Sequence, residues 1–407
     1  MPKTVLSLLF MLFMFAIVAQ TKDSIVFKNG LDRPSILPTH HFGIFSARVG
    51  ANFKILPAKT QQLSLNYTSG NNFHPFVEAH FPKDPSVREA LSKIIWFNRR
   101  FDYVDQSTTP ADYMNIVIDA IIKEFRLSYN IPIENENELH IAVRSYLISK
   151  GKHPFSLFTS DETIEWFHSN IAGGNDPFGR RYYGINQVNF EYLDRNGNTL
   201  RLNANDVFVG GLELHHYYYP NILRNEKRHI YTNLGSHLGL NTSTYNLALD
   251  YGISINSIKQ IFFRNKNRLS LGVGANILRK NFINFNTDNI DFGTNQHLAA
   301  FESQLEYSKH TRQGNYNAIG LNYRIQTRYN KKEEADYYRL LGKWQEINGG
   351  WHNGVSTLYN ALSDWTIIYT YATHSYKLSL FIKQDLQVNN APDFQTGINL
   401  SIPIHRK

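Results

Sequence analysis

Alternation of apolar and polar residues runs through many strand-like segments in the last two-thirds of the chain. In residues 268–277 the odd positions are Leu, Leu, Val, Ala and Ile, and the even positions are Arg, Ser, Gly, Gly and Asn. Successive side chains of a strand point to opposite faces, so this period of two predicts strands with one apolar and one polar face. Many such strands with so polar a second face fit a transmembrane β-barrel, with lipid outside and polar side chains or water inside.

The predicted fold is therefore all-β: one antiparallel transmembrane barrel of about 14 strands, in the range of about 12–16, between about residues 40 and 404. A soluble exported β-sandwich is the alternative, because a sandwich also alternates but buries its apolar face. Leu269, Leu271 and Val273 separate the two folds, since they point into lipid in a barrel and into a sheet-on-sheet core in a sandwich. The candidate strands lie near 43–53, 61–69, 116–131, 138–149, 186–194, 207–218, 229–240, 244–256, 267–279, 297–308, 316–329, 362–373, 376–386 and 394–404.

Two short helices interrupt the strands before residue 175. Apolar residues at helical spacing between Val87 and Ile95 predict one helix near 85–100. The second, near 160–172, is indicated by the capping-box spacing of Thr159 and Glu162 and by the Gly-Gly pair at 173–174. Its apolar face comprises Ile164, Phe167 and Ile171. We expect this face at the membrane interface or the barrel rim, with a partial plug of the barrel mouth as the alternative.

The first 20 residues have the features of a secretory signal peptide. Lys3 precedes an almost wholly apolar run from Val5 to Val18, and Ala19-Gln20 suits a cleavage site. The expected domains are a signal peptide at 1–20 and a single barrel domain at 21–407. No later apolar run is long enough for a spanning helix, which excludes a helical inner-membrane protein. The absence of cysteine excludes disulfides, a lipoprotein anchor and thiolate metal sites.

These features predict a location in the outer membrane of a Gram-negative bacterium. The expected partners are outer-membrane lipids, lipopolysaccharide, the barrel-assembly machinery during insertion and a small solute. Nucleic acid is not an expected partner, because the basic residues behind the net charge of +8 are spread along the chain. We expect no cofactor and no metal, since no phosphate-binding loop, EF-hand or HExxH motif occurs.

Strand parity assigns charged side chains to the lumen. Glu302 and Glu306 precede Arg324 and Arg328 on the next strand with the same parity, which predicts cross-strand pairing. Ladders of this kind commonly fill a barrel. The predicted lumen charge ladder consists of Glu302, Glu306, Arg324, Arg328, Asp250 and Glu191.

The candidate catalytic residues are Glu213, His215 and His237. The two histidines are one hairpin apart and both point inward, and a carboxylate beside an imidazole is a general-base arrangement or part of a metal site. With 16 histidines in the chain such a coincidence is expected, so no catalytic residue is assigned. A hydrolase would place these groups on the outer wall at headgroup level, with a nucleophile within about 3 Å of a histidine.

A loose resemblance to a known family covers about a quarter of the chain. Residues 124–129 (EFRLSY), Ile131-Pro132-Ile133, residues 163–168 (TIEWFH) and residues 176–179 (DPFG) follow an order similar to the DUF3187 family of outer-membrane barrels. The resemblance implies an outer-membrane barrel and no catalytic residues. Two functions stay open: a channel-like or structural barrel with a polar charged lumen, and an outer-membrane hydrolase acting on acyl chains of lipid A or phospholipids.

Overall fold

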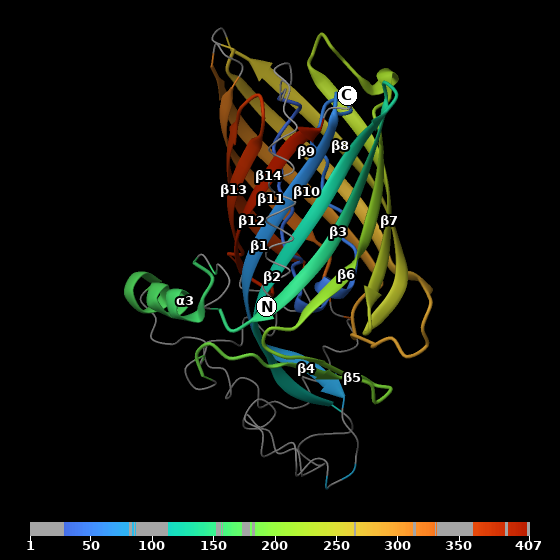
Figure 1. The fold of residues 1–407 in the computed structure, drawn as a ribbon, viewed down its shortest axis with the longest axis vertical. Helices are drawn as coiled ribbons and strands as arrows, with labels where there is room; N and C mark the ends of the chain where they lie inside the picture. Colours follow the sequence, from blue (N-terminus) through green and yellow to red (C-terminus); the bar gives the residue numbers. More distant parts are fainter. Residues whose placement is uncertain are drawn as a thin grey trace.

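Twelve antiparallel strands close into a barrel (Figure 1). Each wall strand pairs with its neighbours along the chain, and the first strand pairs with the last. The predicted signal peptide and nearly all of the helix expected near 85–100 lie outside the described residues. The computed structural model describes residues 28–80, 84, 86, 113–151, 156, 158–172, 180, 184–263, 266–311, 315–329, 331, 361–386 and 390–404.

The wall strands are long and the other elements are short. The wall consists of β1 (Gln61–His80), β2 (Tyr113–Ile133), β3 (Asn137–Ser149), β6 (Val207–Tyr218), β7 (Ile230–Ser243), β8 (Asn246–Phe262), β9 (Arg268–Asn284), β10 (His297–His310), β11 (Tyr316–Gln326), β12 (Leu362–Ala372), β13 (Lys377–Gln384) and β14 (Phe394–Ile404). The remaining elements are the 3-10 helices η1 (His41–Phe45) and η3 (Asn221–Leu223), the helix α3 (Asp161–Phe167), the π-helical turn η2 (His168–Ala172), and the strands β4 (Phe190–Leu193) and β5 (Thr199–Leu202).

The wall has two strands fewer than the central prediction of 14, at the lower end of the expected range of 12–16. The segment expected as a strand at 186–194 contains β4, which pairs with β5 in a separate two-stranded sheet joined by the turn at Asn196-Gly197. The segment expected as a strand at 43–53 lies inside the barrel and joins no sheet. Both segments have the alternating pattern of a strand, but neither forms a strand of the barrel wall.

The apolar side chains of the wall point outward, as the alternation predicts. Leu271 and Val273 on β9 are 47% and 38% exposed, whereas Ser270 and Asn276, of the opposite parity, are buried in the lumen. The sheet closes on itself, so its apolar face has no second sheet to pack against. The β-sandwich alternative is therefore wrong, and the exterior is an apolar surface suited to lipid.

The two mouths of the barrel differ. At one end, here called the terminal mouth, β1 begins at Gln61 opposite the end of β14 at Ile404. Its connections are short, such as the three residues between β2 and β3. The opposite end, the loop mouth, carries the long connections 81–112, 150–206 and 327–361. An outer-membrane barrel shows this asymmetry, with short periplasmic turns and longer extracellular loops.

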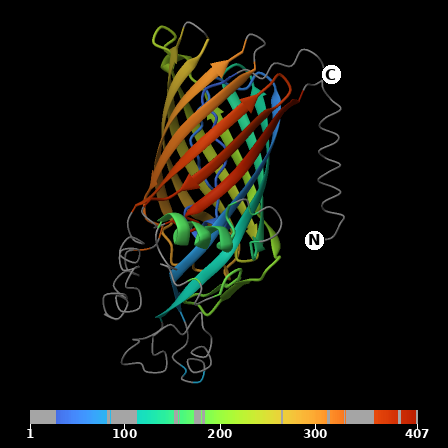
Figure 2. The same ribbon diagram turned by 90° about the vertical axis from the view of Figure 1, so that its left-hand side faces the viewer.

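Helix α3 lies outside the barrel wall near the loop mouth (Figures 1 and 2). Its N-cap is Ser160, whose hydroxyl accepts from the Thr163 N–H, and not the predicted Thr159. Phe167 and Ile171 of the predicted apolar face are exposed, together with Trp166, while Asp161 is buried. The partial plug of the barrel mouth, the alternative for this helix, is therefore wrong, and its place at the membrane interface stays a prediction. In the described part of the chain, no helix is long and apolar enough to cross a membrane.

Candidate functional site

Residues 28–60, here called the plug, run through the inside of the barrel as a hairpin (Figure 1). Lys28 contacts Glu306 near the terminal mouth. The chain then crosses to the loop mouth, where η1 packs against Phe190, Tyr192 and Phe292. It returns to the terminal mouth, where the Ala58 N–H donates to Glu138. Both ends of the plug therefore lie at the same mouth.

The returning limb of the plug packs against glycines of the wall. Ala47, Val49, Ala51 and Phe53 alternate along it, and each lies against a lumen-facing glycine. A Cβ on these glycines would lie 2.1 Å from Ala47 (Gly239), 3.0 Å from Val49 (Gly252), 2.9 Å from Ala51 (Gly274) and 2.7 Å from Phe53 (Gly272). The limb is thus an extended chain with period two, which explains why its sequence resembles a wall strand.

The substitution Gly239→Ala tests this packing. The new methyl group would meet Ala47 at 2.1 Å, while its nearest wall atom, Asp250 Cβ, is 3.7 Å away. Overpacking of this kind costs about 1–3 kcal/mol. We expect the unplugged fraction, which is the fraction of molecules whose plug has left the lumen, to rise roughly 5- to 150-fold. Conductance in planar bilayers measures this fraction.

Two further variants control this prediction. Ala47→Gly in the Gly239→Ala background restores the space and should restore closure. Gly235→Ala adds a methyl group whose three nearest atoms belong to wall side chains, Ser254 Oγ at 2.3 Å and the His237 ring from 2.7 Å, so it overpacks the wall without touching the plug and should not raise the conductance. An equal rise in the Gly239→Ala and Gly235→Ala variants would contradict the assigned contact.

Wall carboxylates hold the backbone of the plug. A buried segment outside any sheet needs partners for its N–H groups. Side chains of the lumen supply them. Five acceptors are carboxylates and one is the amide of Gln395: Asp32 N donates to Glu306 (2.8 Å), Leu37 N to Gln395 (2.9 Å), Ala47 N to Asp250 (2.7 Å), Arg48 N to Glu213 (3.1 Å), Ala51 N to Glu302 (3.2 Å) and Ala58 N to Glu138 (2.7 Å). The acidic side chains of the lumen therefore accept hydrogen bonds from the plug and do not only pair with basic side chains of the wall.

Ion pairs add to these bonds along both limbs. Arg33 binds Glu302 through Nε at 2.5 Å and Nη2 at 3.0 Å. Further pairs join Arg48 to Glu124, Lys54 to Glu138, and Asp32 to Lys28 and Lys377. The two limbs are thus tied by charge to strands on several sides of the barrel.

The Lys28–Asp32 pair stays ionised in the lumen. Burial disfavours the charged form of both residues, but their neighbours outweigh it. Asp32 and Glu306 hold the pKa of Lys28 above its ordinary value. Lys28 and Lys377 hold the pKa of Asp32 below its ordinary value. The first turn of the plug is therefore charged across the neutral range.

The structure places the predicted charge ladder only in part as expected. Glu302 lies opposite Arg324, with Arg324 Nε at 3.5 Å. Glu306 lies opposite Gly320 and pairs with Lys28 instead. Arg328 follows the end of β11, so its predicted pairing on that strand is not formed.

The other two ladder residues have different environments. Asp250 is buried and binds the plug at Ala47 and the wall at Asn241 and Asn281, through hydrogen bonds of 2.7–2.8 Å. The prediction for Glu191 is wrong, because it lies on β4, opposite Arg201 of β5, and not on the barrel wall. Parity along one segment cannot show whether that segment belongs to the wall.

The histidines form a row across neighbouring strands. Asn130, His140, His215 and His237 lie directly opposite one another on β2, β3, β6 and β7. His215 and His237 face each other with their Nδ1 atoms 2.8 Å apart. His215 Nε2 lies 3.2 Å from Glu213, and His237 Nε2 lies 2.8 Å from the hydroxyl of Ser254. The predicted trio is thus brought together inside the lumen.

Sequence reasoning missed His140 in this row and Ser254 beside it. Both have the lumen parity of their strands, and that parity was the signal that could have found them. It also missed the arginines at Glu213, where Arg126 forms an ion pair and Arg144 Nε lies 3.0 Å away. Among the described residues, no group of three His, Cys, Asp or Glu side chains is placed to hold a metal ion.

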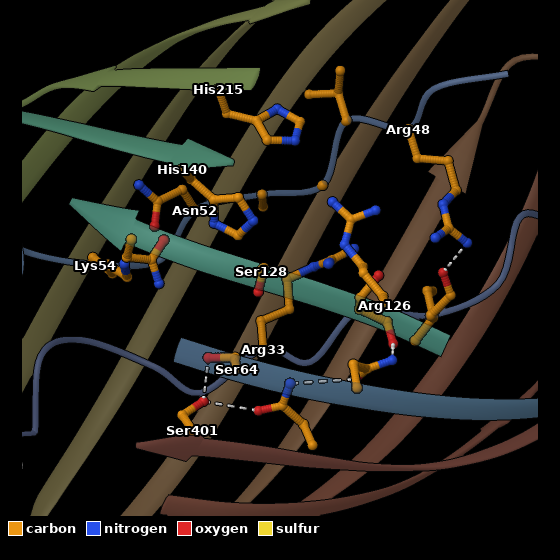
Figure 3. Close-up of a pocket in the computed structure, with 18 of the residues that line it drawn as sticks. Arg33, Arg48, Asn52, Lys54, Ser64, Arg126, Ser128, His140, His215 and Ser401 are labelled. Atoms are coloured by element: carbon orange, nitrogen blue, oxygen red, sulfur yellow. Dashed lines mark hydrogen bonds between the residues drawn. The ribbon is translucent and has the colours of Figure 1, made fainter. Parts of the chain in front are cut away.

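The cavities beside the plug, among the described residues, include two with room for a small molecule. The first, here called the basic cavity, has a volume of about 200 Å³ and lies between the plug and the wall (Figure 3). Arg126, His140 and His215 contribute to its lining. The second, about 420 Å³, lies at the loop mouth between η1 and the β9–β10 connection. The lumen is therefore occupied mainly by the plug, with limited room for a solute.

Comparisons with known proteins match barrels and no named family. No family model and no curated protein match the chain, so the resemblance to DUF3187 stays a prediction. An outer membrane channel from Pseudomonas putida F1 matches at 10% identity and a TM-score of 0.40, over 88% of this chain and 99% of that one. The NanC porin matches at 8% identity and a TM-score of 0.34, over 70% of this chain and 94% of that one. OprB from Pseudomonas putida matches at 9% identity and a TM-score of 0.30, over 84% of this chain and 93% of that one. Likenesses at this level carry no information on activity.

Proposed function

We propose that this protein is an outer-membrane barrel that conducts a small polar solute when its plug moves. Its apolar exterior suits lipid, and the asymmetry of its connections suits a periplasmic terminal mouth. Outer-membrane lipids and lipopolysaccharide would contact the exterior, and the barrel-assembly machinery would insert the chain. The resemblance to DUF3187 barrels agrees with this proposal.

The observation that carries the proposal is how the plug is held. Along both limbs hydrogen bonds and ion pairs join it to the wall, such as Ala47 to Asp250 and Arg33 to Glu302. Water or a polar solute can replace contacts of this kind, whereas a continuous apolar core would resist hydration. Among the described residues, the apolar contacts of the plug fall in separate clusters: η1 and Leu37 at the apex, Leu31, Ala51 and Phe53 against Ile258, and Ile36 against Ile368 and Phe381. The polar contacts of the plug can thus be replaced when the plug leaves the lumen.

Replacing residues 32–52 with a short Gly-Ser linker tests the proposal. Leu31 N and Phe53 O are already 3.0 Å apart, so a short linker closes the gap without strain on the wall. We expect little conductance from the intact protein in planar bilayers and a large, stable conductance from this variant. Heat-modifiable gel migration would show that the barrel has folded. A folded variant that conducts no more than the intact protein would refute the proposal.

A lipid-modifying hydrolase is the second candidate, because of the hydrogen-bonded chain from Ser254 through His237 and His215 to Glu213. A nucleophile beside a base oriented by a carboxylate is the usual arrangement of acyl hydrolases. Here the chain lies in the lumen and not on the outer wall, and Glu213 is also bound by two arginines. Release of fatty acid from lipopolysaccharide or phospholipid, abolished by Ser254→Ala, would favour the hydrolase; no release by the intact protein would exclude it.

A further inference from the structure

The basic cavity is surrounded by positive charge. Residues of the plug and of seven wall strands line it beside the histidine row (Figure 3). Among the described residues, no aspartate or glutamate contributes to the lining. The lining cations are Arg33, Arg48, Lys54, Arg126, Arg324 and Lys377.

The acids that pair with these cations lie behind them. Arg126 binds Glu213 through Nη2, and Lys54 binds Glu138 through its ammonium group. Neither glutamate contributes to the lining, and both are fully buried among other side chains. The carboxylates thus lie behind the guanidinium and ammonium groups that they bind, and the surface of the cavity itself is cationic. A surface lined by charges of one sign attracts a ligand of the opposite sign.

Several buried polar atoms at the cavity have no hydrogen-bond partner among the described residues. They include Nη1 of Arg126, Nε2 of His140 and Oδ1 of Asn130. All three residues line the cavity, and Asn130 lies opposite His140 in the β2–β3 register. A buried polar group without a partner costs about 1–3 kcal/mol, so a ligand that binds these atoms gains what the empty cavity lacks. The arginine edge suits an oxyanion, and the asparagine oxygen suits a hydroxyl donor.

The remaining wall of the cavity has the chemistry that binds hydroxyl groups. Ser64, Ser128 and Ser401 contribute hydroxyls from β2 and the β1–β14 seam. Ser64 donates to Ser401 at 2.7 Å, and Ser401 donates to Asn399 at 3.1 Å. Serine and asparagine side chains both donate and accept, which matches the hydroxyls of a sugar. The cavity thus combines a cationic side with a neutral hydrogen-bonding side.

We propose that the basic cavity binds a small hydroxylated oxyanion, a sugar acid or a sugar phosphate. The oxyanion would lie at Arg126 and the plug cations, and the hydroxyls at Asn130 and the serines. This inference rests on the proposed function, since it names the class of solute that the barrel would select. It also makes the plug part of the site, because Arg33, Arg48 and Lys54 belong to it.

Calorimetric titration of the intact protein in detergent tests the site. The probes are glucuronate and glucose 6-phosphate, with glucose as the neutral control and glucosamine as the cationic control. We expect binding of one or both anions and at least roughly ten-fold weaker binding of both controls, the scale of one charge-assisted hydrogen bond. Stronger binding of glucuronate identifies a carboxylate site, and stronger binding of glucose 6-phosphate a phosphate site. Equal binding of glucose, or no binding of either anion, would overturn the proposal.

Two variants place the ligand. Arg126→Gln should weaken anion binding by roughly ten-fold or more, and Arg126→Lys should restore part of it. If Arg126→Gln fails to fold, His140→Phe gives the same test without removing an ion pair. If both single variants fold and bind the anion with unchanged affinity, this cavity is not the site. Binding needs no conduction, so a protein that conducts without binding overturns this inference alone, and one that binds but never conducts overturns the proposed function alone.

Discussion

Replacing Glu302 with alanine is expected to release the plug from an otherwise intact barrel. The Glu302 carboxylate is fully buried and touches both limbs, through Arg33 at 2.5 Å and the Ala51 N–H at 3.2 Å. It also lies 3.5 Å from Arg324 of the wall. Without it, two guanidinium groups face each other in the lumen with no carboxylate between them. Breaking a buried pair in this way costs about 3–5 kcal/mol.

Withdrawal of the plug relieves most of that cost, because Arg33 leaves the lumen and water reaches Arg324. We therefore expect the unplugged fraction to rise by roughly two to three powers of ten, measured as conductance and as cleavage of the plug by trypsin. Asp364→Ala is the matched control, since Asp364 is a buried lumen acid that pairs with Lys383 of the wall at 3.9 Å and forms no hydrogen bond with the described part of the plug. Opening by both variants to the same extent would mean that the lumen responds to lost charge in general and not to the lost plug contact.

Replacing Glu213 with alanine should weaken the wall itself. Arg144 is fully buried, with its Nε 3.0 Å from Glu213, and Arg126 pairs with the same carboxylate. Both arginines belong to wall strands and cannot leave the lumen as the plug can. The loss should therefore reduce stability by about 3–5 kcal/mol, seen as a lower temperature at which the folded band converts to the unfolded band on gels.

The matched control for this prediction is His215→Phe. It removes the imidazole beside Glu213 but leaves the carboxylate with both arginines, so the barrel should stay nearly as stable as the intact protein. A hydrolase would behave in the reverse way, because each substitution would abolish activity while stability changed little. Equal thermal stability of the Glu213→Ala variant and the intact protein would refute the structural role.

The sequence predicts the wall well because burial alternates with the pleat. Leu271 and Val273 face outward and Ser270 faces inward for the same reason that His215 and His237 meet: parity determines the face of a strand. The same rule fails for Ala47, Val49 and Ala51, because a period of two reports an extended chain and not its partner. It fails for Glu191 because β4 pairs outside the wall.

The candidate site depends on contacts that no local pattern contains. Arg33 and Glu302 are 269 residues apart, and Arg48 and Glu213 are 165 residues apart. The glycines of β7 and β9 reveal the path of the returning limb only once the wall has closed around it. A lumen filled by a distant part of the chain is thus a property of the assembled barrel.

The hairpin course of the plug gives the molecule a directional mechanical response. A pulling force on Lys28 from the terminal mouth would break the contacts of the first limb one after another, first with Glu306, then with Glu302 and then with Gln395. A pull on η1 from the loop mouth would load both limbs at once and meet the summed resistance of all their bonds. A partner on the side of the terminal mouth could thus unlock the barrel with far less force than one on the opposite side.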